Sequence, residues 1–274
     1  MNDDPRRFLR RLGTVSEVPM RIALWREYFS DAHPENALKT VQYIMAARRE
    51  NRTHAGVAML ALGRLIQSDP ALVRKALLGA AAVAQDADVL SLLTQMEPVK
   101  IAHRTQLRAP ALNTDRDTTL GERRSWARSQ DRDVLTRLLL DPDPGVIQNL
   151  LTNPRLLERD VLRIASAQPV SSEVLKVVFE SDKWGQRKAI QAALIQNPYT
   201  PPELGRSLLE LLDEVDLKSV LNARQIHSDL REGARDKLRT RRQTHNDAVQ
   251  VLEDEWVSEL LARRHDESGG DEGT

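Results

Sequence analysis

The fold is decided by a short stretch that contains three prolines, Asn197-Pro198-Tyr199-Thr200-Pro201-Pro202-Glu203. A residue that precedes proline is pushed out of the α region, so a helix must stop at Asn197. Thr200 can accept a hydrogen bond from the first turn of a new helix, Pro201 presets φ, and Glu203 can complete a capping box. A stop and a restart this close together predict two helices folded back on each other.

The same punctuation occurs more than once along the chain. The segment Val146–Pro154 aligns without gaps on Ile190–Pro198, 44 residues further on, and a weaker third copy begins at Leu217. A helix pair fits between the first two copies, which indicates a unit of about 22 to 26 residues whose alternate copies are more alike. Such a period predicts stacked helix pairs, each burying an apolar stripe on its neighbours.

Apolar residues recur at helical spacing in most of the chain. Representative stripes are Val73, Leu77, Ala80, Ala81 and Ala84; Leu157, Val161, Ile164 and Ala165; and Leu204, Leu208, Leu211 and Leu212. Each set marks one face of a helix. The best strand candidate, Val174–Phe179, follows Ser171-Ser172-Glu173, which is a plausible helix start and favours helix there as well. The sequence therefore predicts an all-α fold.

Composition narrows the class of protein. The chain has 274 residues, 40 basic and 40 acidic side chains, no cysteine, and 41% hydrophobic but only 4% aromatic residues. The absence of cysteine excludes disulfides, thiolate nucleophiles and cysteine-ligated zinc. The longest nearly apolar run, Ala76–Ala84, is far shorter than the ~20 residues of a spanning helix, and the charged start predicts no signal peptide. We expect a soluble, cytoplasmic protein, and the balanced charge argues against a dedicated nucleic-acid coat.

The pattern of helices predicts five regions. A connector is expected where Pro98 and Pro110 interrupt the sequence without any sustained stripe. The regions are an N-terminal helical part at 1–95, the connector at 96–117, a repeat region at 118–240, an amphipathic helix at 241–264 and a disordered acidic tail at 265–274. The amphipathic helix has two open interpretations, because it can seal the last repeat or lie in a groove of a partner.

No motif in the sequence indicates an enzyme. His227-Ser228-Asp229 holds the residue types of a hydrolase triad, but adjacent side chains cannot converge, and Ser228 is better explained as a helix cap. The stretch Asp141-Pro142-Asp143-Pro144-Gly145 lacks the spacing of a calcium loop and predicts a turn. We find no phosphate-binding glycine loop and no metal-ligand spacing, so we expect no cofactor and no metal.

Two arginine-rich stretches are candidates for contact with a partner. Lys100–Arg128 holds seven basic and three acidic residues, and Arg231–Arg242 holds six basic and two acidic residues. The candidate contacts are Arg123, Arg124 and Trp126 in the first stretch, together with a second patch formed by Trp184, Arg187 and Lys188. Arginine beside an exposed tryptophan can grip phosphate and bases or form a protein hot spot. The alternative is that Trp126 belongs to the core and the arginines are its solvated flank.

Three side chains near these patches have open roles. Gly185 either allows a close approach of two backbone segments or serves a turn. Asn153 and Asn197 can bind a ligand, but their position just before proline favours capping of backbone groups.

Several of these segments resemble helical-repeat families. Asp69-Pro70-Ala71-Leu72-Val73-Arg74-Lys75-Ala76 looks like the turn and second-helix start of HEAT repeats, and 141–147 is similar except that Ile147 replaces the arginine. The segments ending in Asn153-Pro154 and in 197–204 resemble the leucine-rich repeat variant family. The resemblance covers about 53–93 and 131–238. It implies an α-solenoid and a protein-binding scaffold, with some nucleic-acid-binding members.

Together these features predict a right-handed α-solenoid of short HEAT-like helical pairs with a helical N-terminal part. The expected function is that of a non-enzymatic scaffold or adaptor that binds a protein partner along a curved surface. Two alternatives remain open: nucleic-acid binding by the same repeats, and an accessory or maturation factor of an enzyme.

Overall fold

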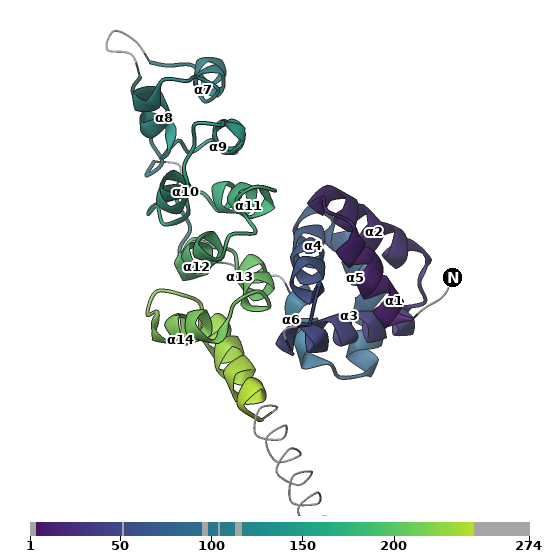
Figure 1. Ribbon diagram of the computed structural model, residues 1–274. Helices are drawn as coiled ribbons and strands as arrows, with labels where there is room; N and C mark the ends of the chain where they lie inside the picture. Colours follow the sequence, from purple (N-terminus) through teal and green to yellow (C-terminus); the bar gives the residue numbers. More distant parts are fainter. Residues whose placement is uncertain (1–3, 51, 95–97, 104, 113–116, 244–274) are drawn as a thin grey trace, which may run out of the picture. The chain divides into compact units, whose positions relative to one another are not determined.

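The computed structural model describes residues 4–50, 52–94, 98–103, 105–112 and 117–243 (Figure 1). All regular secondary structure within these ranges is helical, which confirms the predicted all-α fold. The chain divides into two compact units, 1–234 and 235–274. The first unit holds helices α1 to α14, and the described part of the second unit, 235–243, is helical.

Six helices form the N-terminal part of the first unit. They are α1 (Pro5–Thr14), α2 (Val18–Asp31), α3 (Pro34–Arg49), α4 (Ala55–Ser68), α5 (Pro70–Val83) and α6 (Ala87–Leu93). Phe8, Trp25, Tyr28 and Phe29 pack ring against ring in their core, and the Trp25 indole N–H donates to the backbone oxygen of Ala58 at 3.1 Å. Four of the ten aromatic residues therefore join α1 to α2, and the Trp25 hydrogen bond links this cluster to α4.

Proline stands in the first turn of several of these helices. Pro34 and Pro70 are the first residues of α3 and α5, and Pro19 is the second residue of α2. Asp69 caps α5 by accepting a hydrogen bond from the amide of Leu72. Proline at these positions costs no hydrogen bond, because the first amides of a helix have no partner within it.

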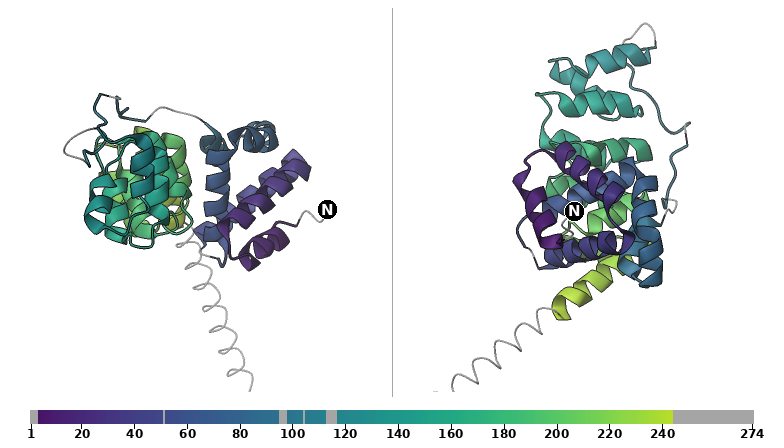
Figure 2. Two further views of the ribbon diagram at one scale, coloured as in Figure 1. Left: turned by 90° about the horizontal axis from the view of Figure 1, so that it is seen from above. Right: turned by 90° about the vertical axis from the view of Figure 1, so that its right-hand side faces the viewer.

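Eight shorter helices follow in two rows (Figures 1 and 2). The first row is α7 (Leu120–Trp126), α9 (Pro144–Thr152), α11 (Ser172–Glu180) and α13 (Pro202–Leu209), and the second is α8 (Arg132–Leu138), α10 (Glu158–Ala165), α12 (Lys188–Gln196) and α14 (Glu214–Asn222). Consecutive helices alternate between the rows, and within a row α9 contacts α7 and α11 while α12 contacts α10 and α14. Helices of the first row begin at residues 120, 144, 172 and 202, at intervals of 24, 28 and 30 residues.

The proline-rich stretch at 197–203 stops one helix and starts the next, as predicted. Helix α12 ends with Asn197 as its C-cap, and α13 begins at Pro202. The predicted role of Thr200 is wrong: its hydroxyl donates backwards to the carbonyl oxygen of Leu194, and the residue before the new helix is Pro201, one position later than expected. The buried hydroxyl thus satisfies an acceptor at the end of α12 rather than a donor at the start of α13.

The 44-residue sequence match has a different meaning from the one expected. Val146–Pro154 covers most of α9, whereas Ile190–Pro198 covers most of α12, and these two helices belong to opposite rows. Two helices, α10 and α11, lie between them, so the shift is three helices rather than an even number. The match therefore marks a repeated way of ending a helix and not a repeated position in the rows.

Buried arginines join the N-terminal helices to the rows. The guanidinium of Arg64 on α4 donates to the carbonyl oxygen of Ser181 and pairs with Asp182, each at 2.7 Å, and lies over the ring of Phe179. Burial lowers the pKa of Arg64 against the opposing effect of Asp182. Arg206 on α13 donates to the carbonyl oxygens of Ser91 and Thr94 at the end of α6, each at 2.8 Å. These bonds occupy carbonyls at helix ends that no helical amide can reach.

The predicted connector carries no helix in its described residues, 98–103, 105–112 and 117. Its backbone contacts the link between α12 and α13, where the amide of Lys100 donates to the carbonyl oxygen of Pro198 at 3.0 Å. The helices before and after it belong to the same compact unit, so the domain limits at 95 and 118 stay a prediction. The amphipathic helix at 241–264 and the acidic tail at 265–274 lie outside the described residues except for 241–243.

Candidate interaction surface

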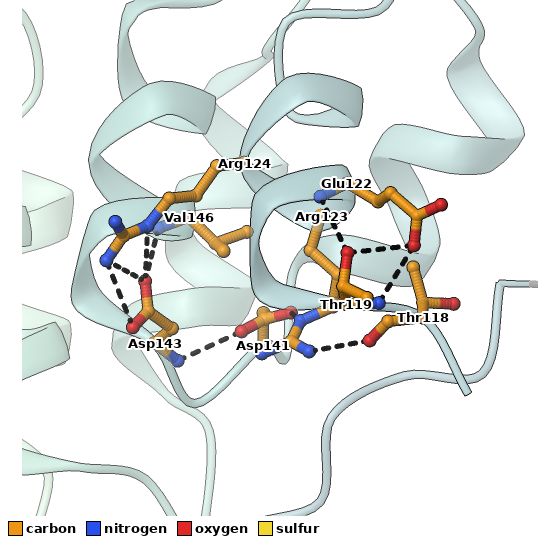
Figure 3. A network of polar contacts seen from close by, with 8 residues as sticks. All are labelled: Thr118, Thr119, Glu122, Arg123, Arg124, Asp141, Asp143 and Val146. Atoms are coloured by element: carbon orange, nitrogen blue, oxygen red, sulfur yellow. Dashed lines mark hydrogen bonds and ion pairs between the residues drawn. The ribbon is translucent and has the colours of Figure 1, made fainter.

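The first predicted cluster lies at α7 and is built around a buried ion pair (Figure 3). The Nε of Arg123 donates to Asp141 at 2.7 Å, and its Nη1 donates to the carbonyl oxygen of Thr118. The side chains of Arg123 and Asp141 are 12% and 0% exposed. Burial raises the pKa of Asp141, although the amide of Asp143 and the guanidinium act against it. Arg123, one of the expected partner contacts, is thus paired inside the protein, and its contact with a partner stays a prediction.

The neighbouring residues of this cluster are more accessible. Arg124 is half exposed and donates to Asp143, which also caps α9 by accepting from the amide of Val146 at 3.0 Å (Figure 3). Trp126 is partly buried. Arg124 remains available to a partner, because an exposed ion pair of this kind contributes little to stability.

In the second predicted patch, formed by Trp184, Arg187 and Lys188, the tryptophan is buried. Trp184 is only 3% exposed, and its indole N–H donates to the carbonyl oxygen of Leu151 at 2.9 Å, at the end of α9. Lys183 and Arg187 cover its ring, with charged groups 4.3 and 5.3 Å from the ring centroid. In the described structure Trp184 is therefore a core side chain that holds α9 against the α11–α12 turn, and its predicted contact with a partner finds no support in this burial.

Arg187 and Lys188 belong to a line of ion pairs along the N-terminal ends of the second row. Successive helices of this row are linked by Arg132–Asp160 (2.5 Å), Arg187–Glu158 (2.6 Å) and Lys188–Asp213 (3.2 Å). The side chain of Lys188 is 73% exposed and that of Arg187 is 47% exposed, so both can still reach a partner. The two predicted clusters do not meet, because α9, α10 and α11 separate α7 from α12 (Figure 1).

Asn153 and Asn197 make the same set of bonds in the two rows. The amide nitrogen of Asn153 donates to Ala127 and Ser129 at the end of α7, and its side-chain oxygen accepts from the amide of Arg155. Asn197 donates to the carbonyl oxygens of Ala165, the last residue of α10, and of Ala167, and accepts from the amide of Tyr199. Each asparagine ties a helix end to the end of the helix two before it, so the interpretation as backbone caps is confirmed and neither side chain is a ligand site.

The tie between α8 and α10 makes stability depend on pH. Burial alone would raise the pKa of Asp160, but Arg132 and the amide of Leu157 more than offset it, so the pKa of Asp160 lies below its ordinary value. A carboxylate with a lowered pKa contributes stability above about pH 4, and this contribution is lost as the pH falls through the lowered value. We expect Asp160→Asn to cost about 1–2 kcal/mol at pH 7, and the difference from the parent chain to shrink below about pH 4. Urea unfolding of both chains across this pH range measures the difference in the free energy of unfolding. A difference that does not change with pH would contradict the prediction.

The two short motifs with residue types of an active site have structural roles. Asp141 and the residues after it form the turn between α8 and α9, as predicted. His227, not Ser228 as expected, caps the helix that follows, because its Nδ1 accepts from the amide of Asp229 at 3.2 Å; Asp229 itself pairs with Arg206. Among the described residues, histidine and carboxylate side chains nowhere gather in a group of three or more that could hold a metal ion.

A pocket of about 490 Å³ opens between the connector, the α8–α9 turn and the stretch from the end of α10 to the start of α11. Leu107 and Arg108 of the connector line one side, Leu140 and the turn after α8 line another, and Arg163 of α10 and Val174 of α11 complete it. Sequence reasoning identified only Arg108, as part of the basic stretch Lys100–Arg128. The pocket itself was missed, because its lining combines three separate stretches of the sequence, 106–108, 139–142 and 163–174.

Comparisons with family models, curated proteins and solved structures found no match to this chain. Within the part of the chain that the structure describes, no helix combines the length and the apolar character needed to cross a bilayer.

Proposed function

We propose that the two rows are a right-handed α-solenoid of short HEAT-like helical pairs, and that the chain is a non-enzymatic, cytoplasmic scaffold or adaptor. A protein partner binds along the surface of the rows. The observation that supports this proposal most is that four pairs of neighbours within a row, α7–α9, α8–α10, α10–α12 and α12–α14, are joined by side-chain bonds. These bonds are made by Asn153, Arg132–Asp160, Asn197 and Lys188–Asp213, respectively. Such helices bury their stripes on one another and leave an extended outer surface for recognition.

The polar side chains of the rows support a binding role over a chemical one. Asp141 and Asp160 are held by arginines, and the two asparagines are saturated by backbone groups. The exposed members, Arg124, Arg187 and Lys188, face solvent and can exchange an internal partner for an external one.

Affinity purification of the tagged full chain, followed by chemical cross-linking and mass spectrometry, tests the proposal. We expect a protein partner whose cross-links fall on lysines of the rows, such as Lys183, Lys188 and Lys218, and whose capture survives nuclease treatment. Capture that falls steeply with salt and is lost on nuclease treatment would favour nucleic-acid binding instead. Cross-links confined to α1–α6 would contradict the proposal.

A further inference from the structure

The mouth of the connector pocket carries positive charge that nothing in the described chain neutralises. Arg108 and Arg163 both line the pocket, both are exposed, and neither forms an ion pair with a described residue. The acidic side chain in the lining, Asp141, is fully buried and already accepts from Arg123 and from the amide of Asp143. The pocket therefore offers two arginines to an anionic group from outside.

The floor of the same pocket is apolar and partly open. Leu140 is 50% exposed, although it is a large aliphatic residue at the end of α8, and it lies with Pro169, Val170 and Val174 in the lining. The described lining contains no aromatic side chain on which a nucleic-acid base could stack. The volume of about 490 Å³ falls within the range of about 300–1,000 Å³ that is usual for ligand sites.

We infer that this pocket binds an extended acidic segment of the protein partner. A leucine, isoleucine or phenylalanine of the segment packs on Leu140, and a neighbouring aspartate or glutamate pairs with Arg108 and Arg163. The positive charge of Arg108 and Arg163 favours an acidic residue of the segment, and the apolar lining around Leu140 favours its large hydrophobic residue. The inference rests on the proposed scaffold function and names the class of segment that the scaffold recognises.

Fluorescence polarisation with labelled synthetic peptides and the full chain tests the inference. The probes are short peptides with one central leucine or phenylalanine flanked by aspartate and glutamate in a glycine–serine background. Two matched sets replace the acids by lysine or the central residue by serine, and oligothymidylate serves as the nucleic-acid probe. We expect saturable binding of the acidic apolar peptides, and binding of each matched set weaker by roughly tenfold or more.

Variants of the pocket then locate the binding. Arg108→Glu and Arg163→Glu should each weaken peptide binding by roughly tenfold or more, and Leu140→Ser by roughly fivefold. Arg155→Glu is the matched control, because Arg155 is exposed in the α9–α10 turn and does not line the pocket; it should change affinity by less than about twofold. Thermal unfolding should be nearly unchanged in all four variants, since the side chains are exposed.

Several outcomes would overturn the inference. They are no binding of any acidic peptide, equal losses in Arg155→Glu and Arg163→Glu, an unchanged affinity of Leu140→Ser, or tighter binding of oligothymidylate than of peptide. The proposed function fails separately. If the Arg108→Glu/Arg163→Glu double variant still captures the cross-linked partner, the scaffold function is supported and the pocket is not its binding site. If the parent chain captures no protein partner, the proposed scaffold function is wrong.

Discussion

The Gly185→Ala variant is expected to be less stable than the parent chain by about 3 kcal/mol. A Cβ added at Gly185 would lie 2.0 Å from the backbone oxygen of Phe179 and 2.9 Å from the Nη2 of Arg64. Phe179 is fully buried, so its backbone cannot retreat without disturbing the contact between α11 and α4. Urea unfolding followed by far-UV circular dichroism measures the loss of stability. Of the two roles that the sequence left open for Gly185, these distances favour the close approach of two backbone segments.

Gly79→Ala is the matched control for this glycine. Gly79 lies inside α5, and an added Cβ meets no heavy atom within 4 Å. Removing a flexible glycine from an open helical position should stabilise the chain by about 0.5–1 kcal/mol. If the free energy of unfolding changes in the same direction in Gly79→Ala and Gly185→Ala, the close packing at Gly185 does not determine the effect of its substitution.

The fold could be predicted where local rules decide it. Proline at the first helical turn, side-chain caps and apolar spacing act within a few residues, and they located α5, α9 and α11 correctly. Val174–Phe179 is helical despite its β-branched residues, because Ser171 caps the helix and one face is buried in the rows. These features need no knowledge of which helices meet.

The surface could not be predicted in the same way, because burial depends on distant segments. Trp184 is covered because its indole reaches the end of α9, 33 positions earlier in the chain. Arg123 is neutralised by Asp141 of the following turn, and the sequence gives no sign of that pairing. The pocket needs the connector to pass beside the α8–α9 turn and α10, so Arg108 and Arg163 line the same pocket only in the folded chain.

Asn197→Leu should destabilise the chain by about 3 kcal/mol. The substitution keeps the approximate size of the side chain but removes two donors to the carbonyl oxygens of Ala165 and Ala167 and one acceptor for the amide of Tyr199. Asn197 is only 3% exposed, so water cannot easily replace these bonds. Each backbone group left unsatisfied in a buried place adds to the cost. Equilibrium unfolding in urea again gives the difference.

Asn153 tests whether the 44-residue sequence match reflects the same hydrogen bonds at the ends of two helices. Asn153 makes the corresponding three bonds in the other row, so Asn153→Leu should cost a similar free energy, and the double variant should show additive losses to within about 0.5 kcal/mol. Asn149 is the control, because it also bonds to α7 but is more accessible to water; Asn149→Leu should cost less than about 1 kcal/mol. A small loss in all three variants would mean that the asparagines are not structural ties. A large loss in Asn153→Leu and Asn197→Leu alone would mean that the 44-residue match has a structural cause. In both rows an asparagine then serves to bond the carbonyl oxygens at the end of a helix, which no helical amide can reach.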